Sequence, residues 1–559
     1  MPQGNLTSYD ATRLLGLESS MPKATLRSLT IERFKGYWDK ATLEIAPLTI
    51  LLGRNNSGKS SLIQVLLFLK QTLANSRGNA PLFLEGPLID ALGLQELTSG
   101  WPDGDVLDGP ELSLIWDSIV DVEEILLGER YKPEMNNLAK HSGISWLEEE
   151  VNHVHLKTEF SISFSQISGN IIVKDANLRS WRYGENSEPS ENPSAHFQRD
   201  NESNTYLFKW KSDNASQILV EFDRFLPVIS IDRGRIGPRH RQRSFLNGYK
   251  ILYEQPLEDL RKLLLEFNYL GSNRNIPHSI YRPTVNPPEE IGVSGEYAVQ
   301  LLHSRQTEFV HYLPPSAINV ESTEMPDLVL AKPLAEAVND VIKGLGINVD
   351  ISLREIENFG FQFLVGSASL QHVGRGLGYL LPVVVLGLIA DPICFNEPDH
   401  DVGLQNYVNA CVSIRHAGLE EPEAHLHPKV QTLLAHWFVA LAMAGRRIIV
   451  ETHSDHLVRR LRGLVARTQP GSPLEKWLTE SIVIGETVQA SNGHSSLSCS
   501  TLTSTGKITE RWPADFMDEA ANEEREIYYA GLDKSDISIA LPDETEFIHD
   551  PADEIEIEA

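Results

Sequence analysis

The sequence has little cysteine and no long apolar run, and both absences exclude classes of protein. Only Cys394, Cys411 and Cys499 occur in 559 residues, far apart and without metal-binding spacing. We therefore expect a reducing, cytoplasmic setting rather than a disulfide framework. No stretch approaches the roughly 20 apolar residues of a membrane span. Residues 1–24 lack a basic segment followed by an apolar core, so we expect a flexible N-terminus, no signal peptide and no membrane partner.

Positive charge is also scarce. The chain has 49 Lys and Arg against 77 Asp and Glu, a net charge of −28, which argues against a general electrostatic grip on nucleic acid. The most basic stretch, Arg233–Arg243, is either a solvated loop or a local contact for nucleic acid or phosphate. The acidic segment 533–559 is typical of a disordered, solubilising tail, and the alternative is a tail that docks a partner or mimics DNA.

One stretch carries a specific chemical pattern. Residues Gly53-x-x-x-x-Gly58-Lys59-Ser60 follow an apolar, strand-like run at Leu48–Leu52 and precede a helical pattern, which is the context of a P-loop. Glycines let loop N–H groups approach phosphate, lysine reaches the β- and γ-phosphates, and the serine hydroxyl binds Mg²⁺. The sequence therefore predicts an ATP and Mg²⁺ site whose nucleotide-binding residues are Gly53, Asn55, Asn56, Ser57, Gly58, Lys59, Ser60 and Ser61.

Hydrolysis also needs a metal-side carboxylate and a base for the attacking water. Glu420 and Glu421 end an apolar run, and alternation along a strand should send their side chains apart. We assign Glu420 with Ser60 to Mg²⁺ and Glu421 to the water. His453 ends the next strand-like run, where it could sense the γ-phosphate or position the water.

A second glycine-rich turn, at Gly374, Arg375 and Gly376, precedes an apolar helix and offers more N–H groups for phosphate. It lies about 300 residues after the P-loop. We therefore expect an ATP-sandwich homodimer, possibly a higher oligomer, in which Arg375 acts on the partner's ATP. His425 and His427 lack further ligands at metal spacing and do not predict zinc.

These segments resemble ABC-type ATPases of the SMC-like and OLD-like group, often described as AAA ATPases. The likeness covers about residues 25–100 and 265–525, and it is carried by LTIERFKGYWDKATLEIAPLTILLGRNNSGKSS, LQHVGRGLGYLLPV, LEEPEAHLHPKVQ and IIVETHSDHLVRRL. By resemblance these are the Walker A, signature, Walker B with D-loop, and switch-histidine segments. Glu420 stands where the family usually has aspartate, the signature lacks the LSGGQ string of transporters, and Gln95 is the candidate Q-loop residue.

The resemblance implies an α/β fold, an ABC-type P-loop ATPase head with a mixed or parallel sheet flanked by helices and a large inserted α+β region. Without heptads we expect no long coiled-coil arm, and we predict a helix at Leu328–Leu345. The expected divisions are a first half of the head at 25–105, an insertion at 106–265 with a mobile polar loop at 183–204, a second half at 266–485, an extension at 486–532 and the acidic tail.

The family also implies ATP-driven dimerisation in DNA metabolism or antiviral defence. The chain resembles nuclease-less members, as in Septu-like and retron-associated systems, which control a separately encoded effector such as a nuclease. Three functions stay open: a defence ATPase that controls such an effector, an SMC-like repair or recombination ATPase that binds DNA directly, and a regulatory module that binds ATP without turnover. A transporter motor is disfavoured because of the long insertion and the signature.

Overall fold

The computed structural model describes residues 24–509, 523 and 525–526. Within that range it leaves out 77, 102–105, 128–134, 150–151, 184–188, 201–204, 212, 215–217, 232–244, 284–287, 321–323, 358, 392–401, 405–406 and 408–414. The basic stretch Arg233–Arg243, the flexible N-terminus up to residue 23, and the acidic tail at 533–559 therefore lie outside the described residues.

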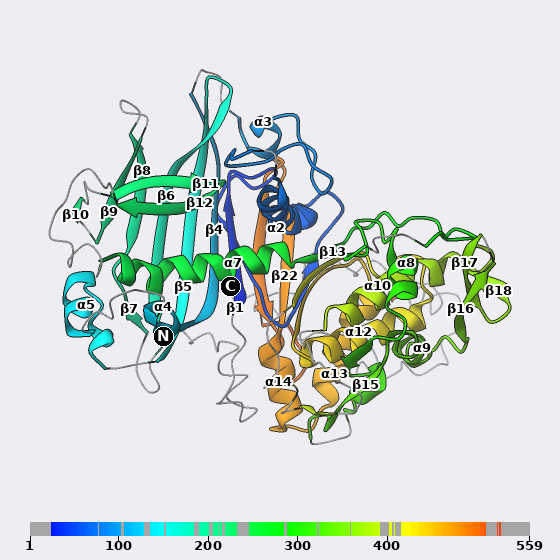
Figure 1. Cartoon of the computed structure of the whole chain (residues 1–559). Helices are drawn as coiled ribbons and strands as arrows, with labels where there is room; N and C mark the ends of the chain where they lie inside the picture. The colour runs from blue at the N-terminus through cyan, green and yellow to red at the C-terminus, as the bar shows by residue number, and fades with distance from the viewer. Residues whose placement is uncertain are drawn as a thin grey trace, which may run out of the picture.

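A six-stranded sheet forms the centre of the molecule (Figure 1). Its first five strands are parallel and the sixth is antiparallel, as expected for a mixed sheet. The order is β13 (Asn268–Leu270), β20 (Arg415–Glu420), β21 (Arg446–Glu451), β3 (Leu48–Leu52), β22 (Ile482–Gln489) and β23 (Ser495–Thr501).

Both faces of this sheet are covered at its centre, which explains why β3 (LTILL) is almost continuously apolar and buried along its whole length. Leu48, Ile50 and Leu52 of β3 pack into one core, and the intervening Leu51 packs into another. The first core is built with α10 (Arg375–Ile389), α12 (Pro428–Met443) and α13 (Asp455–Arg467), and the second with α2 (Lys59–Ala74). The P-loop helix and the helices of the C-terminal half thus lie on opposite faces.

A second, antiparallel sheet extends from the N-terminal strands (Figure 1). Leu29 of β1 pairs with Leu114 of β4, so the chain after residue 105 continues the sheet that β1 begins. Helix α7 (Gln255–Leu265) packs against β1, β4 and α2. The order is β10 (Asp213–Asn214), β9 (Thr205–Trp210), β8 (Ala195–Asp200), β6 (Asn170–Arg182), β5 (His153–Ile167), β4 (Val106–Asp121), β1 (Ala24–Glu32) and β2 (Ala41–Glu44), with β7 (Ser190–Glu191) beside β6.

The polar stretch at 183–204 contains more regular structure than its composition suggests. Ala195–Asp200 forms β8, with Ala195 and Phe197 buried between β6 and β9. The alternation of these two apolar residues with polar ones is sufficient for a half-buried strand. Mobility of the rest of this stretch stays a prediction.

The remaining elements cover the sheets and build the lobe at the right of Figure 1. The predicted helix at Leu328–Leu345 is wrong in its first third, because Leu328–Pro333 is strand β15, and only Leu334–Gly344 is helix α9. The others are α3 (Leu94–Leu97), α4 (Val122–Leu127), α5 (Met135–Ser142), β11 (Ile218–Asp223), β12 (Leu226–Ile231), α8 (Ala298–Ser304), β14 (Phe309–Tyr312), β16 (Ile351–Ile356), β17 (Gly360–Val365), β18 (Ala368–Ser369), β19 (Val402–Gly403) and α14 (Pro473–Ser481), with short 3-10 turns and a π-helical turn at Lys250–Glu254. No helix among the described residues is both long enough and apolar enough to cross a membrane.

Strand β20 has a weakly apolar sequence, RHAGLE, yet five of its six residues are buried. Gly418 explains part of this. A methyl group at this position would lie 2.9 Å from the Ile63 side chain of α2 and 3.1 Å from the Phe267 ring. The missing side chain therefore lets the P-loop helix pack directly on the strand that carries Glu420.

We predict that Gly418→Val lowers the free energy of unfolding by about 2 kcal/mol, because the added side chain overpacks a closed core. Chemical denaturation followed by circular dichroism measures the change. Gly463→Ala is the matched control: the nearest atom to its added methyl is 3.5 Å away in α13, and alanine favours helix by roughly 0.5–1 kcal/mol over glycine. Equal destabilisation by both substitutions would contradict this account of β20.

Candidate nucleotide site at the carboxyl edge of the central sheet

The P-loop connects β3 to α2 and is held by the neighbouring strand β22. Gly53 and Gly58 have φ angles of 145° and 100°, which residues with a side chain rarely adopt. A methyl group on Gly53 would also lie 2.4 Å from the Thr487 carbonyl oxygen. The Ser57 and Thr487 hydroxyls are 2.6 Å apart and hydrogen-bonded. The loop therefore needs glycine at positions 53 and 58, and it is anchored to β22, 430 residues later in the chain.

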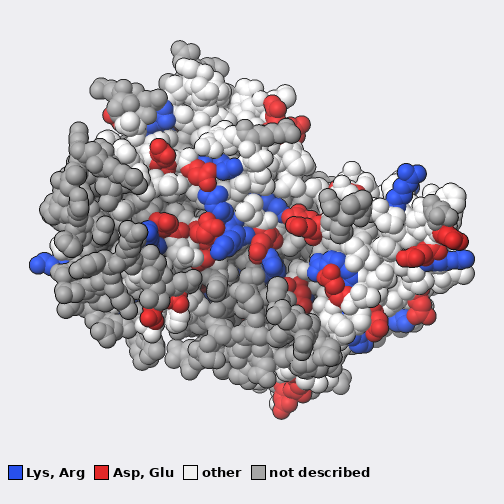
Figure 2. Space-filling model, in the orientation of Figure 1, with Lys and Arg blue, Asp and Glu red and all other residues white. Residues whose placement is uncertain are grey.

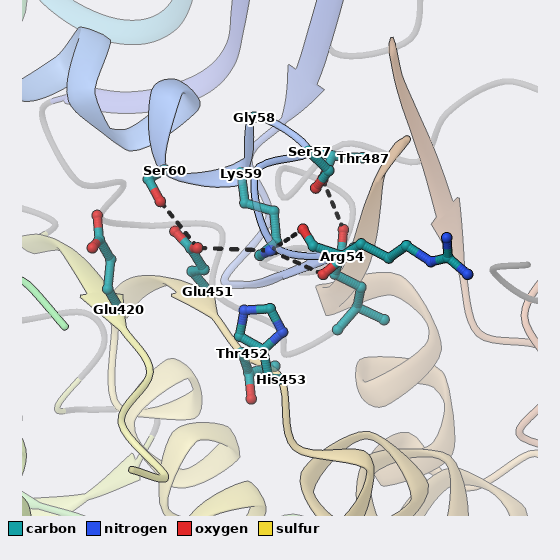
Figure 3. Close-up of polar contacts among 12 residues, drawn as sticks. Arg54, Ser57, Gly58, Lys59, Ser60, Glu420, Glu451, Thr452, His453 and Thr487 are labelled. Atoms are coloured by element: carbon teal, nitrogen blue, oxygen red, sulfur yellow. Dashed lines mark hydrogen bonds and ion pairs between the residues drawn. The ribbon is translucent and has the colours of Figure 1, made fainter. Parts of the chain in front are cut away.

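Lys59 is folded into this loop. Its ammonium group donates to the carbonyl oxygens of Gly53 at 2.9 Å and Arg54 at 2.8 Å (Figure 3). Burial lowers the pKa of Lys59, while the nearby carboxylates of Glu451 and Glu421 oppose that shift. The ammonium thus lies beside the cradle that the P-loop pattern predicts for phosphate.

Two carboxylates meet this loop from adjacent strands. Glu420 and Glu451 are Cα partners at the carboxyl ends of β20 and β21, so their side chains leave the sheet on the same face. Glu451 accepts a 3.0 Å hydrogen bond from the Ser60 hydroxyl and lies 3.9 Å from the Lys59 ammonium. The Tyr269 hydroxyl donates to Glu420 at 2.8 Å.

Sequence reasoning missed Glu451. It assigned the metal-side carboxylate to Glu420 alone, whereas the carboxylate that directly contacts Ser60 comes from β21. The available signal was the position of Glu451, two residues before His453 at the end of a buried strand. Burial and the neighbouring Glu420 raise the pKa of Glu451 to about 7. Burial also raises the pKa of Glu420.

Arg274, four residues after β13, stabilises the carboxyl end of β20. Its guanidinium donates at 2.8 Å to the backbone carbonyl oxygen of Glu420 and is only 4% exposed. Burial lowers the pKa of Arg274 to about 10, so the group is charged at neutral pH. This buried cation lies beside a group of acidic side chains that would otherwise repel one another.

Glu421 begins the turn after β20 and differs from Glu420 in its environment. Its φ is 44°, in the left-handed region, and its amide donates to the Glu451 carbonyl oxygen at 2.8 Å. The Glu421 side chain is half-buried, and that of Glu420 is buried. A non-glycine residue in this conformation is strained, which is frequent at functional sites.

His453 lies just beyond β21, below Lys59 and Glu451 in Figure 3. Its backbone amide donates to the buried Glu423 carboxylate at 2.7 Å. Partial desolvation and the nearby Lys59 charge lower the pKa of the imidazole. The ring is therefore mostly neutral at physiological pH and can both donate and accept a hydrogen bond.

The Gly374–Gly376 turn begins α10 and packs on the loop that follows Glu421. A methyl on Gly376 would lie 2.9 Å from the His425 carbonyl oxygen, and the Tyr379 and His425 rings meet edge to face at 4.6 Å. Gly374 and Arg375 are exposed. His427 caps α12 through a 3.3 Å bond from the Lys429 amide.

The predicted nucleotide residues therefore divide into two groups. Residues 53–61, Glu420, Glu421 and His453 gather at one edge of the central sheet, while Gly374, Arg375 and Gly376 open a separate helix whose first residues are exposed. Gln95, the candidate Q-loop residue, lies in the short helix α3, and its role stays a prediction.

The donor set fits a hard divalent cation. Ser60 offers a hydroxyl and Glu420 and Glu451 offer carboxylates, the oxygen ligands that Mg²⁺ prefers. One carboxylate oxygen of Glu451, Oε2, is buried without a hydrogen-bond partner in the described part of the chain. An orphaned buried oxygen beside the P-loop serine is what a site for Mg²⁺ would leave.

A comparison with known protein families gives one match. The family model described as "AAA ATPase domain" matches residues 25–222 and 416–458. These ranges include the P-loop, the strand ends that carry Glu420 and Glu451, and His453. A search of curated proteins found no match.

Three SMC head domains are among the solved structures that the chain matches. One is the SMC head bound to the C-winged helix domain of ScpA, with 11% identity, a TM-score of 0.35, and coverage of 85% of this chain and 98% of that one. The SMC head domain from Thermotoga maritima has 10% identity and a TM-score of 0.31, and the match covers 86% of this chain and 98% of that one. The third is the Pyrococcus furiosus SMC head domain with an extended coiled coil, bound to the C-terminal domain of ScpA. It has 10% identity and a TM-score of 0.34, and the match covers 90% of this chain and 100% of that one.

The predicted fold class is confirmed by the central sheet and the family match together. Strand β3, which leads into the P-loop, lies beside β21, which precedes His453. Strand β20, which ends at Glu420, lies on the other side of β21. Residues 25–222 and 416–458 match the model of an AAA ATPase domain, and the chain has the mixed α/β fold of a P-loop ATPase head.

Proposed function

We propose that this chain binds ATP with Mg²⁺ and hydrolyses it. The observation that carries the proposal is the convergence of Lys59 and Ser60 with three glutamates on adjacent strand ends. Glu451 bonds Ser60 at 3.0 Å and lies 3.9 Å from the Lys59 ammonium, and its register partner Glu420 precedes Glu421. A phosphate cradle, a cation site and a candidate base therefore occur together, as phosphoryl transfer to water requires.

Each side chain has a distinct task in this proposal. Lys59 turns from the loop carbonyls to the β- and γ-phosphates, and Ser60 and Glu420 hold Mg²⁺, whose charge offsets that of the phosphates. Glu421, half-buried at the start of its turn, accepts the proton of the attacking water. His453, neutral at physiological pH, donates a hydrogen bond to the γ-phosphate.

We also propose that two copies close on ATP. The exposed Gly374 and Arg375 precede the 15-residue helix α10, and a helix N-terminus attracts anions. The same turn packs on the loop after Glu421. In a dimer, a nucleotide in the P-loop of one copy would then also contact the Gly374–Gly376 turn of the other copy. Arg375 then offsets the charge that develops on the partner's γ-phosphate.

The biological role follows from the family resemblance. We propose a cytoplasmic ATPase that controls a separately encoded effector, such as a nuclease, in antiphage defence. The alternative is an SMC-like repair or recombination ATPase that binds DNA directly. On the face in Figure 2, acidic and basic side chains lie next to one another over the middle of the molecule. This mixture and the net charge of −28 favour a protein partner over extended contact with DNA.

We predict that Lys59→Ala abolishes ATP binding, and that Glu421→Gln binds ATP but turns it over about 100- to 10,000-fold more slowly, the typical contribution of a general base. Phosphate release and calorimetric ATP titration measure these effects. Glu221→Gln, on an exposed site in β11, is the charge-matched control. Unchanged turnover in Glu421→Gln would exclude it as the base, and no turnover in the unmutated chain would favour a regulatory module.

We predict that ATP increases the dimer fraction of Glu421→Gln, because slow turnover preserves the nucleotide that joins two copies. Analytical ultracentrifugation with ATP and without nucleotide measures that fraction. Adding Arg375→Ala should reduce it, and Lys59→Ala should eliminate the response to ATP. Dimerisation that ignores ATP and both substitutions would rule out the sandwich while leaving the P-loop assignment intact.

We predict little DNA binding at physiological salt. The alternative function predicts binding that falls steeply with salt and disappears when Arg239, Arg241 and Arg243 are changed to alanine, since each phosphate contact releases counterions. Fluorescence anisotropy with labelled duplex at several salt concentrations distinguishes the two. Strong binding that depends on these arginines would favour the DNA-repair function.

A further inference from the structure

Glu451 has an unusual environment for a carboxylate. The residue is 5% exposed, and its Oε1 accepts the Ser60 hydrogen bond at 3.0 Å. Its Oε2 is buried and has no hydrogen-bond partner among the residues that the structure describes. A carboxyl group in this state is shifted toward its neutral form unless a cation compensates the charge, so a ligand of positive charge would stabilise the carboxylate here.

The neighbouring carboxylate is engaged elsewhere. Glu420 accepts the Tyr269 hydroxyl at 2.8 Å, and Arg274 holds its backbone carbonyl oxygen at 2.8 Å. Both glutamates leave the sheet on the same face as register partners. In Figure 3, Glu451 lies between Glu420 and the Lys59 ammonium, directly below Ser60. Glu451 is therefore the carboxylate next to both P-loop groups.

Lys59 does not satisfy the second oxygen. The ammonium is 3.9 Å from Oε1, and its short hydrogen bonds go to the carbonyl oxygens of Gly53 and Arg54. When Lys59 turns to a bound phosphate, Glu451 loses part of its electrostatic attraction to the ammonium group. A divalent cation would replace that positive charge, because oxygen donors from Ser60 and two glutamates are suited to Mg²⁺.

We propose that Glu451, directly or through one water, is a ligand of the nucleotide-bound Mg²⁺ together with Ser60. This assignment rests on the proposed function and adds a β21 carboxylate to the site. Glu420 then contributes from the next strand, oriented by Tyr269 and Arg274. The hydrogen bond between Ser60 and Glu451 holds the two donors together before the cation binds.

A purely electrostatic role for Glu451 makes the opposite prediction. If Glu451 only repelled phosphate, its neutralisation would strengthen nucleotide binding with or without metal. If it holds the cation, neutralisation weakens nucleotide binding only when metal is present. Glu451→Gln tests this, because glutamine keeps an oxygen acceptor for Ser60 while it removes the charge.

The experiment uses the full chain with ADP, and Mn²⁺ as a paramagnetic substitute for Mg²⁺. Electron paramagnetic resonance of free Mn²⁺ gives the metal dissociation constant at saturating ADP, and calorimetry gives ADP affinity in Mg²⁺ and in EDTA. We expect Glu451→Gln to weaken Mn²⁺ binding about tenfold or more, as loss of a ligand or its support does. Affinity for ADP should fall in Mg²⁺ but not in EDTA.

Glu421→Gln is the matched control, because it removes the same charge from a carboxylate that acts electrostatically on Glu451, and we expect a smaller loss of Mn²⁺ affinity. Thermal denaturation without nucleotide checks that both variants fold. Equal Mn²⁺ affinity in the two variants, or tighter ADP binding by Glu451→Gln in Mg²⁺, would overturn the assignment while ATP turnover by the unmutated chain upheld the proposed function. If the unmutated chain neither bound Mn²⁺ with ADP nor hydrolysed ATP, both would fall.

Discussion

The parallel, in-register pairing of β20, β21 and β3 determines where every polar group of the site lies. Glu420 pairs with Glu451, and Glu451 pairs with Leu51, one residue before the end of the P-loop strand. A shift of one residue in either ladder would turn a glutamate into one of the two apolar cores. The burial of both sheet faces therefore fixes the register, and the register sets the distances among Ser60, Lys59 and the carboxylates.

Much of this arrangement could be predicted from the sequence, because the motifs are local. The strand, loop and helix around Lys59 are adjacent in the chain, and Glu420, Glu421 and His453 each follow an apolar run. Glu451 was missed because a glutamate inside a buried strand has no periodic signature, and its meaning depends on the contact with Ser60, 391 positions away. The strand at Leu328–Pro333 was missed since its pairing with β14 and β19 is non-local.

Gly418 and Glu421 show how packing and chemistry compete within a few residues. Gly418 lacks a side chain so that α2 can approach β20. Three residues later the backbone of Glu421 adopts φ 44°, and the chain leaves the sheet with a half-buried carboxylate. The core thus fixes the position of β20, and Glu421 begins the turn that follows it in a left-handed backbone conformation. Glu420 is buried and Glu421 is half-buried, while the divergence of the two side chains and their separate roles stay predictions.

The bond between Ser57 and Thr487 also has a consequence for biosynthesis. The two residues are 430 positions apart, and chains emerge from the ribosome at about 5–20 residues per second. The loop that contains Lys59 therefore waits on the order of tens of seconds for the strand that supports it. Until β21 and β22 are made, both edges of β3 lack their partner strands, and such edges can pair with the wrong strand. The nascent chain thus carries its nucleotide loop without its final support through most of translation.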